Sequence, residues 1–119
     1  MRTIKFKGKC IKDDSWVFGD LCHVMNYVAI KPFSETFRRS LVDPRSVCQF
    51  TGFLDRDGKE IYEGDILNGD SKSEIVFTDS VFAIRSIRYG GDVILDPLYY
   101  FKRKDGTLDC KVIGNKFDE

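Results

Sequence analysis

The sequence predicts an all-β fold, either a barrel or a sandwich, with at most one short helix. Apolar and polar side chains alternate in many short stretches, which is the pattern of half-buried strands. Pairs of glycine and aspartate interrupt these stretches and supply the residues that tight turns require. The length of 119 residues suits one hydrophobic core, so we expect a single domain over residues 1–119.

The N-terminal part is predicted to form a long β-hairpin. Residues 3–10 alternate between apolar side chains on one side and lysines on the other, and residues 12–15 form a polar turn. A second strand begins at Trp16 and continues to Ile30, with a kink or bulge at Gly19.

The next segment is predicted to be either one short helical turn or an irregular loop. Ser34 is a candidate N-cap, and Phe37 and Leu41 would lie one turn apart on the same face. Pro44 ends any such helix, because the residue before a proline avoids the helical conformation.

The block from Val42 to Leu67 alternates strands with turns. A strand around Gln49–Thr51 is broken by Gly52, and the Asp55–Gly58 turn leads to a strand at Ile61–Tyr62. We expect a positive φ at Gly58, which only glycine accepts without strain. The residues to which we assign structural roles are Gly52, Asp57, Gly58, Gly64, Asp65 and Gly114.

The C-terminal half is predicted to contain further short strands. Asn68–Asp70 is a strong hairpin signal, and Phe82, Ile84 and Ser86 should share one face of their strand. The strands are expected at residues 74–77, 80–88, 93–95, 98–102 and 108–115.

Three collinear blocks resemble the YopX family, small proteins carried mainly by bacteriophages and prophages. They are TIKFKGKCIKDDSWVFGDL at residues 3–21, VDPRSVCQFTGFLDRDGKEIYEGDIL at residues 42–67 and KVIGNKFDE at residues 111–119. The chain departs from the family pattern at Cys48, at Lys116 and over residues 90–108.

The resemblance implies a β-rich, barrel-like fold and a phage setting, but no activity. Because Gly64–Asp65 followed by aliphatic residues is common in SH3-like barrels, we expect an SH3-like core with the N-terminal hairpin packed on it. The sequence has no apolar run of signal or membrane-spanning length, so we expect a cytoplasmic protein of the bacterial host without membrane contact.

The cysteines are predicted to be reduced thiols, and we expect neither a cofactor nor a metal. Four cysteines are dispersed along the chain, and their spacing to His23, the single histidine, matches no zinc template. A calcium loop is the other metal alternative, because acidic residues surround Gly58. Gly58 is the fourth residue counted from Asp55, whereas an EF-hand loop has its glycine at position six, so a β-turn with solvated acids is favoured. The acids concerned are Asp55, Asp57, Glu60 and Glu63.

No catalytic constellation is recognised, so we expect a protein that is not an enzyme. The sequence has no nucleophile elbow, no phosphate-binding glycine loop and no spaced Cys–His pair. Asp65 is interpreted as a capping residue at a corner, with a catalytic carboxylate as the alternative.

A basic and aromatic cluster is the candidate binding surface. Small β-barrels can stack bases on aromatic rings while cations follow the phosphates. The alternative is that the aromatic rings belong to the core and the cations form a solvated edge. The cluster consists of Arg85, Arg88, Tyr89, Tyr99, Tyr100, Lys102 and Arg103, with Lys104 beside it.

Charge favours protein docking over nucleic-acid binding. The formal net charge is zero, whereas proteins that neutralise phosphate backbones are usually basic. We therefore expect a phage or prophage accessory protein that acts as a protein-interaction module. Its partner is an unknown host or phage protein, or a second copy paired at an exposed sheet edge. Weak binding of single-stranded nucleic acid is the alternative.

Overall fold

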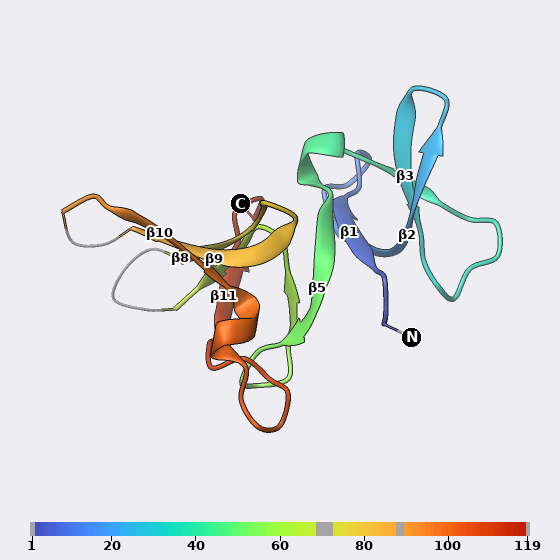
Figure 1. The fold of residues 1–119 in the computed structure, drawn as a ribbon. Helices are drawn as coiled ribbons and strands as arrows, with labels where there is room; N and C mark the ends of the chain where they lie inside the picture. Colours follow the sequence, from blue (N-terminus) through green and yellow to red (C-terminus); the bar gives the residue numbers. More distant parts are fainter. Residues whose placement is uncertain (1, 69–72, 88–89, 119) are drawn as a thin grey trace. The chain divides into compact units, whose positions relative to one another are not determined.

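The computed structural model describes residues 2–68, 73–87 and 90–118, and it is all-β (Figure 1). The chain divides into two compact units, Met1–Phe50 and Thr51–Glu119. The predicted all-β class is confirmed, but neither sheet closes into a barrel, so that part of the expectation is wrong. The single domain, and the packing of the N-terminal hairpin on a core, stay predictions.

The first unit is an antiparallel sheet of sequential hairpins. In spatial order its strands are β4 (Ser40–Val42), β3 (Tyr27–Lys31), β2 (Trp16–Val24), β1 (Phe6–Lys9) and the first residues of β5 (Cys48–Leu54). The strand predicted to run from Trp16 to Ile30 is in fact two strands, because Val24 pairs with Tyr27 across a two-residue turn. Met25 is the first residue of this turn and has a φ of +55°. Residues other than glycine seldom adopt a positive φ, so the sequence does not predict a turn here.

The end of β1 also reaches β4, so this sheet curls back on itself. Cys10 forms an isolated bridge with Val42, and the Ile11 N–H donates to the Leu41 carbonyl at 3.0 Å. Gly8 lies inside this curl, where a Cβ atom would be 3.1 Å from the Val42 side chain. A larger residue at this position would therefore push β1 and β4 apart.

Gly19 is required by a close approach between β2 and the end of β3. A Cβ atom at this position would collide with the Lys31 carbonyl and with the Pro32 Cα. The kink predicted at Gly19 is thus a place where two backbones nearly touch, with φ at +154°.

Lysine side chains of β1 lie on aromatic rings. Lys7 is buried, and its Nζ lies 4.3 Å from the centroid of the Trp16 ring, with the Lys9 Nζ at 4.8 Å from the same ring. The alternation predicted for β1 is therefore present, but its lysine side is covered as well. Cation–π attraction and packing of the lysine stems make this burial tolerable.

The helical turn considered at residues 34–41 is absent. Turns, bends and irregular backbone occupy residues 34–39, strand β4 begins at Ser40, and the Lys31 ammonium donates to the Glu35 carbonyl at 2.8 Å. Phe37 is exposed, so no apolar stripe is buried that would stabilise so short a helix.

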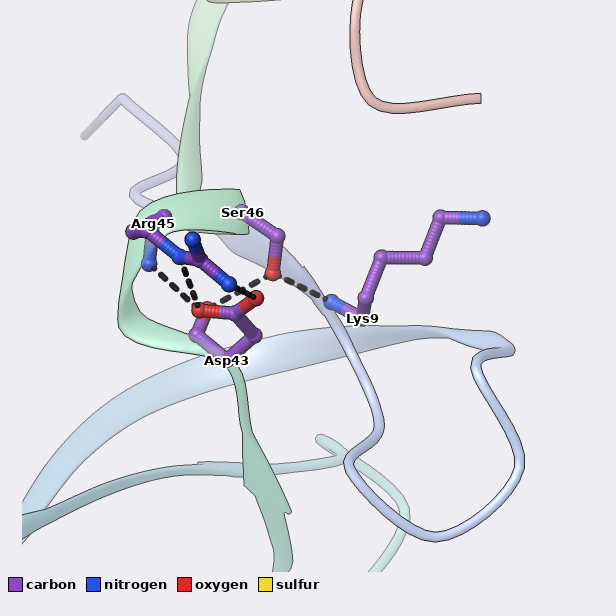
Figure 2. Close-up of polar contacts among 4 residues, drawn as sticks. All are labelled: Lys9, Asp43, Arg45 and Ser46. Carbon is purple, nitrogen blue, oxygen red and sulfur yellow. Dashed lines mark hydrogen bonds and ion pairs between the residues drawn. The ribbon is translucent and has the colours of Figure 1, made fainter. Parts of the chain in front are cut away.

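A 3₁₀ helix, η1 (Pro44–Ser46), follows instead, and Asp43 caps it (Figure 2). The Asp43 carboxylate accepts from the Arg45 backbone N–H at 3.0 Å and forms an ion pair with its guanidinium at 3.0 Å. The buried Ser46 hydroxyl donates to the Asp43 carbonyl and accepts from the Lys9 N–H. This network fixes η1 against the end of β1.

The second unit has a five-stranded antiparallel sheet, and β8, β9 and β10 run side by side in Figure 1. In spatial order the strands are β10 (Val93–Pro97), β9 (Val81–Ile87), β8 (Ser73–Thr78), β7 (Asp65–Leu67) and β11 (Val112–Asn115). The end of β5, the short strand β6 (Glu60–Tyr62) and the 3₁₀ helix η2 (Leu98–Phe101) complete the unit. Its core contains Ile61, Leu67, Ile75, Ile84, Leu98, Leu108, Cys110 and Val112, with Phe53, Phe82 and Phe101 packed against it.

Three local predictions in this unit are wrong. The closing strand expected at residues 108–115 begins only at Val112. Residues 98–101 form η2 rather than a strand, because the buried Leu98 turns into the core immediately after Pro97. Gly52 lies inside β5 instead of ending it. Most of the predicted turn at Asn68–Asp70 lies outside the described residues.

Candidate interaction surface

Asp55 is a buried carboxylate that organises the turn between β5 and β6. Its Oδ1 accepts from the N–H groups of Asp57 and Lys59, each at 2.9 Å, and its Oδ2 accepts from the Val112 N–H at 3.0 Å. Burial opposes ionisation, but the three N–H donors and the charge of Lys59 outweigh it, and the pKa of Asp55 is lowered. The carboxylate is committed to the backbone, which supports the turn interpretation over a calcium loop.

Asp65 caps the corner between β6 and β7, as predicted. Its Oδ2 accepts from the Tyr62 N–H at 2.7 Å, and its Oδ1 accepts from the Asn115 side-chain amide at 2.9 Å. Sequence reasoning gave Asn115 no role, although it also donates to the Glu63 carbonyl at 3.3 Å. Asn115 ends the Val-Ile-Gly-Asn motif near the C-terminus. That position alone does not reveal a hydrogen bond to a side chain fifty positions earlier in the sequence.

The other predicted structural residues lie at turns, a strand interior and a bulge. Gly58 has the predicted positive φ, at +81°, and Gly52 and Gly64 have φ values of +89° and +85°. Gly114 follows a register shift in the pairing of β11 with β7. The Asp57 side chain is exposed, and the capping of this turn comes from Asp55.

The sheet of the second unit presents an apolar face to solvent. Ile75 and Ile84 pair and both belong to the core, so the alternate residues of these strands point to the opposite side. There Val93 pairs with Ile87, and Leu95 follows two residues along β10. We call this surface the outer face; its exposed apolar residues are Val81, Ile87, Val93 and Leu95, with exposed fractions of 39–52%.

The strand β10 also lies at one end of the five-stranded order. Among the described residues, its only hydrogen-bonded neighbour strand is β9. Its sequence, VILDP, contains no lysine or arginine, the charged residues that often protect a sheet edge. The outer face is thus bordered by an edge with little protection beyond Asp96 and Pro97.

The structure only partly assembles the predicted basic and aromatic cluster. Tyr99 and Tyr100 are 69% and 72% exposed on η2, which packs against β9 and β10. The Lys102 ammonium lies 5.8 Å from the centroid of the Tyr99 ring, and Arg103 is exposed in the next turn, followed by Lys104. Arg85 lies on β9, opposite Leu95. Arg88 and Tyr89 lie outside the described residues.

The cysteines differ in accessibility. Cys10 and Cys22 are partly exposed, Cys48 and Cys110 are buried, and all four are free thiols. Burial, with the nearby Asp55 charge, raises the pKa of Cys110 to about 11. His23 is exposed on β2. Among the described residues, no three histidine, cysteine or acidic side chains lie close enough together to hold a metal ion.

Comparison with protein families decides the lineage. The family model described as YopX protein matches residues 3–119, which is nearly the whole chain. The chain belongs to the YopX family. A comparison of this YopX chain with curated proteins finds no match. In the part of the YopX chain that the structure describes, no helix is long and apolar enough to cross a bilayer.

Proposed function

We propose that this YopX-family protein is a non-enzymatic accessory protein of a phage or prophage, acting as a protein-interaction module in the bacterial cytoplasm. The observation that carries the proposal is the outer face, where Val81, Ile87, Val93 and Leu95 are all exposed on one side of a sheet. Ile87, Val93 and Leu95 are neighbours at one end of this face, whereas Val81 lies at the other end of β9. Neighbouring exposed apolar groups mark interaction surfaces more often than isolated ones do.

Charged side chains beside the apolar residues support the binding of one specific partner protein. Arg85 pairs with Leu95 on one side and with Glu74 on the other, so a cation and an anion stand in line across the outer face. Charges next to an apolar contact fix the register of a partner and exclude mismatched ones.

The test is affinity purification of tagged protein from an infected or induced host, with and without nuclease. Val93→Lys with Leu95→Lys should remove a co-purifying protein that the parent retains in both conditions. Met25→Lys with Tyr27→Lys adds the same charge at exposed positions of the first unit and should keep that protein. Equal retention by both double variants would overturn the proposal.

Binding of single-stranded nucleic acid is the second candidate, supported by the exposed Tyr99 and Tyr100 and by Lys102 over the Tyr99 ring. Fluorescence anisotropy with labelled single-stranded DNA and RNA tests it at low and physiological salt. Salt-sensitive binding that Tyr99→Ala with Tyr100→Ala weakens by about 1–3 kcal/mol per stacked base would favour this candidate. No binding at low salt would eliminate it.

A further inference from the structure

The first unit contains an open hollow at the place where the sheet curls. Its volume is about 470 Å³, and its lining comes from two short segments, Cys10–Lys12 and Arg39–Leu41. The Ile11 N–H donates to the Leu41 carbonyl at 3.0 Å, and the bridge between Cys10 and Val42 joins the same two segments. The hollow is therefore formed by backbone that is tied together.

The lining combines an apolar floor with two cations. Ile11 and Leu41 both line the hollow and are 60% and 43% exposed, so their apolar surface is accessible there. Lys12 and Arg39 are exposed as well, and neither has an ion-pair partner among the described residues. The hollow thus offers apolar contact and uncompensated positive charge together.

The nearest acids in sequence do not neutralise these cations by pairing. Asp13 Oδ1 accepts from the Ser15 N–H at 3.1 Å and from the Ser15 hydroxyl at 2.7 Å, and the same carboxylate also interacts with the Cys10 side chain, so it is held by these two residues. Asp14 is exposed, with a φ of +62°, and its N–H donates to the Cys10 carbonyl. Lys12 and Arg39 thus stay without an ion pair among the described residues, although the Asp13 carboxylate lies beside Cys10.

We propose that the hollow binds an acidic peptide segment of a partner protein that inserts one large apolar side chain between Lys12 and Arg39. Charge complementarity selects the acidic flanks, and the Ile11–Leu41 floor selects the apolar side chain. The site is separate from the outer face, so it goes beyond the proposed function and stands or fails independently of it.

The probes are fluorescein-labelled synthetic peptides with the sequences GDEFEDG, GDEAEDG and GKKFKKG, followed by anisotropy at low salt. The acidic phenylalanine peptide should bind, and the alanine peptide should bind about tenfold or more weakly, because it loses a buried aromatic side chain. The basic peptide should not bind. Equal binding of the two acidic peptides would overturn the proposal by showing plain charge attraction.

Two variants and a matched control test the location. Lys12→Glu with Arg39→Glu should abolish binding, and Leu41→Ser, which keeps both cations, should weaken it about tenfold. Lys102→Glu with Arg103→Glu makes the same charge change at exposed positions of the second unit and should leave binding unchanged. Equal weakening by the control would overturn the proposal.

The alkylation rate of Cys10 measures directly whether the peptide occupies the hollow. The peptide should slow alkylation of Cys10, which lines the hollow, but not of Cys22, which is also partly exposed in the same unit. Unchanged Cys10 reactivity at saturating peptide would overturn the assignment. A single-stranded oligonucleotide of matched charge that protects Cys10 equally would also overturn it, since the hollow would then be a general anion site.

Discussion

Replacement of Asp55 by asparagine should destabilise the protein by about 2–4 kcal/mol. The asparagine oxygen can still accept from the N–H groups of Asp57 and Lys59, but its amide NH₂ then faces the Val112 N–H. An orphaned buried N–H costs about 1–3 kcal/mol. The two surviving bonds also lose the charge of the carboxylate, which roughly halves their strength.

Urea denaturation at neutral pH measures this cost, and Asp57→Asn is the control, because it makes the same change on an exposed side chain of the same turn. The control should lie within about 0.5 kcal/mol of the parent. A difference between the two variants below that margin would refute the buried-anchor reasoning.

The pH dependence of the free energy of unfolding is a second test of the role of Asp55. Its folded-state pKa lies below the ordinary value of 3.8, so its stabilising contribution is complete above the unfolded-state pKa and is lost as pH falls through the folded-state pKa. The gap between the parent and Asp55→Asn should therefore be constant near neutral pH and narrow below about pH 4. A gap that widens on acidification would contradict the sign of the pKa shift.

Three further predictions concern the glycines and the thiols. Gly19→Ala should cost more than Gly58→Val, because its Cβ would strike the Lys31 backbone, whereas a Cβ on Gly58 meets no atom within 4 Å. The reverse order of denaturation midpoints would show this reasoning to be wrong. Gly58→Val should still cost on the order of 1–2 kcal/mol, because a β-branched residue is strained at φ +81°; an unchanged midpoint would contradict this. Titration of freshly purified, denatured protein should find four thiols and metal analysis no stoichiometric zinc, while in the native state Cys10 and Cys22 should react before Cys48 and Cys110. A lower thiol count without oxidation, or bound zinc, would disprove it.

Local signals predicted most strands but not the links between distant segments. The Asp55–Gly58 turn and the Gly64–Asp65 corner follow from residue types whose side chains and φ preferences act within a few positions. The bridge from Cys10 to Val42 produces no periodic pattern in the sequence, because its formation depends on how strongly the sheet curls. Sheet closure was therefore the part of the fold that sequence could not decide.

The candidate surfaces were predicted unevenly for the same reason. Tyr99 and Tyr100 were recognised as a possible platform, yet an aromatic pair after a proline suits an exposed strand as well as η2. The hollow beside Lys12 and Arg39 was missed, since its two segments are far apart in sequence and are joined by the Cys10–Val42 bridge and the Ile11–Leu41 hydrogen bond.

The pairing of β11 with β7 has a consequence for the order of folding. β7, β8, β9 and β10 are consecutive neighbours, whereas the pairing of Leu67 with Val112 closes a separation of 45 positions. Because the entropy of closing a long loop must be offset before distant contacts stabilise the chain, we expect β11 to dock after the transition state. Val112→Ala should then accelerate unfolding and leave the folding rate nearly unchanged. A φ-value near 1 for this substitution would reverse the order.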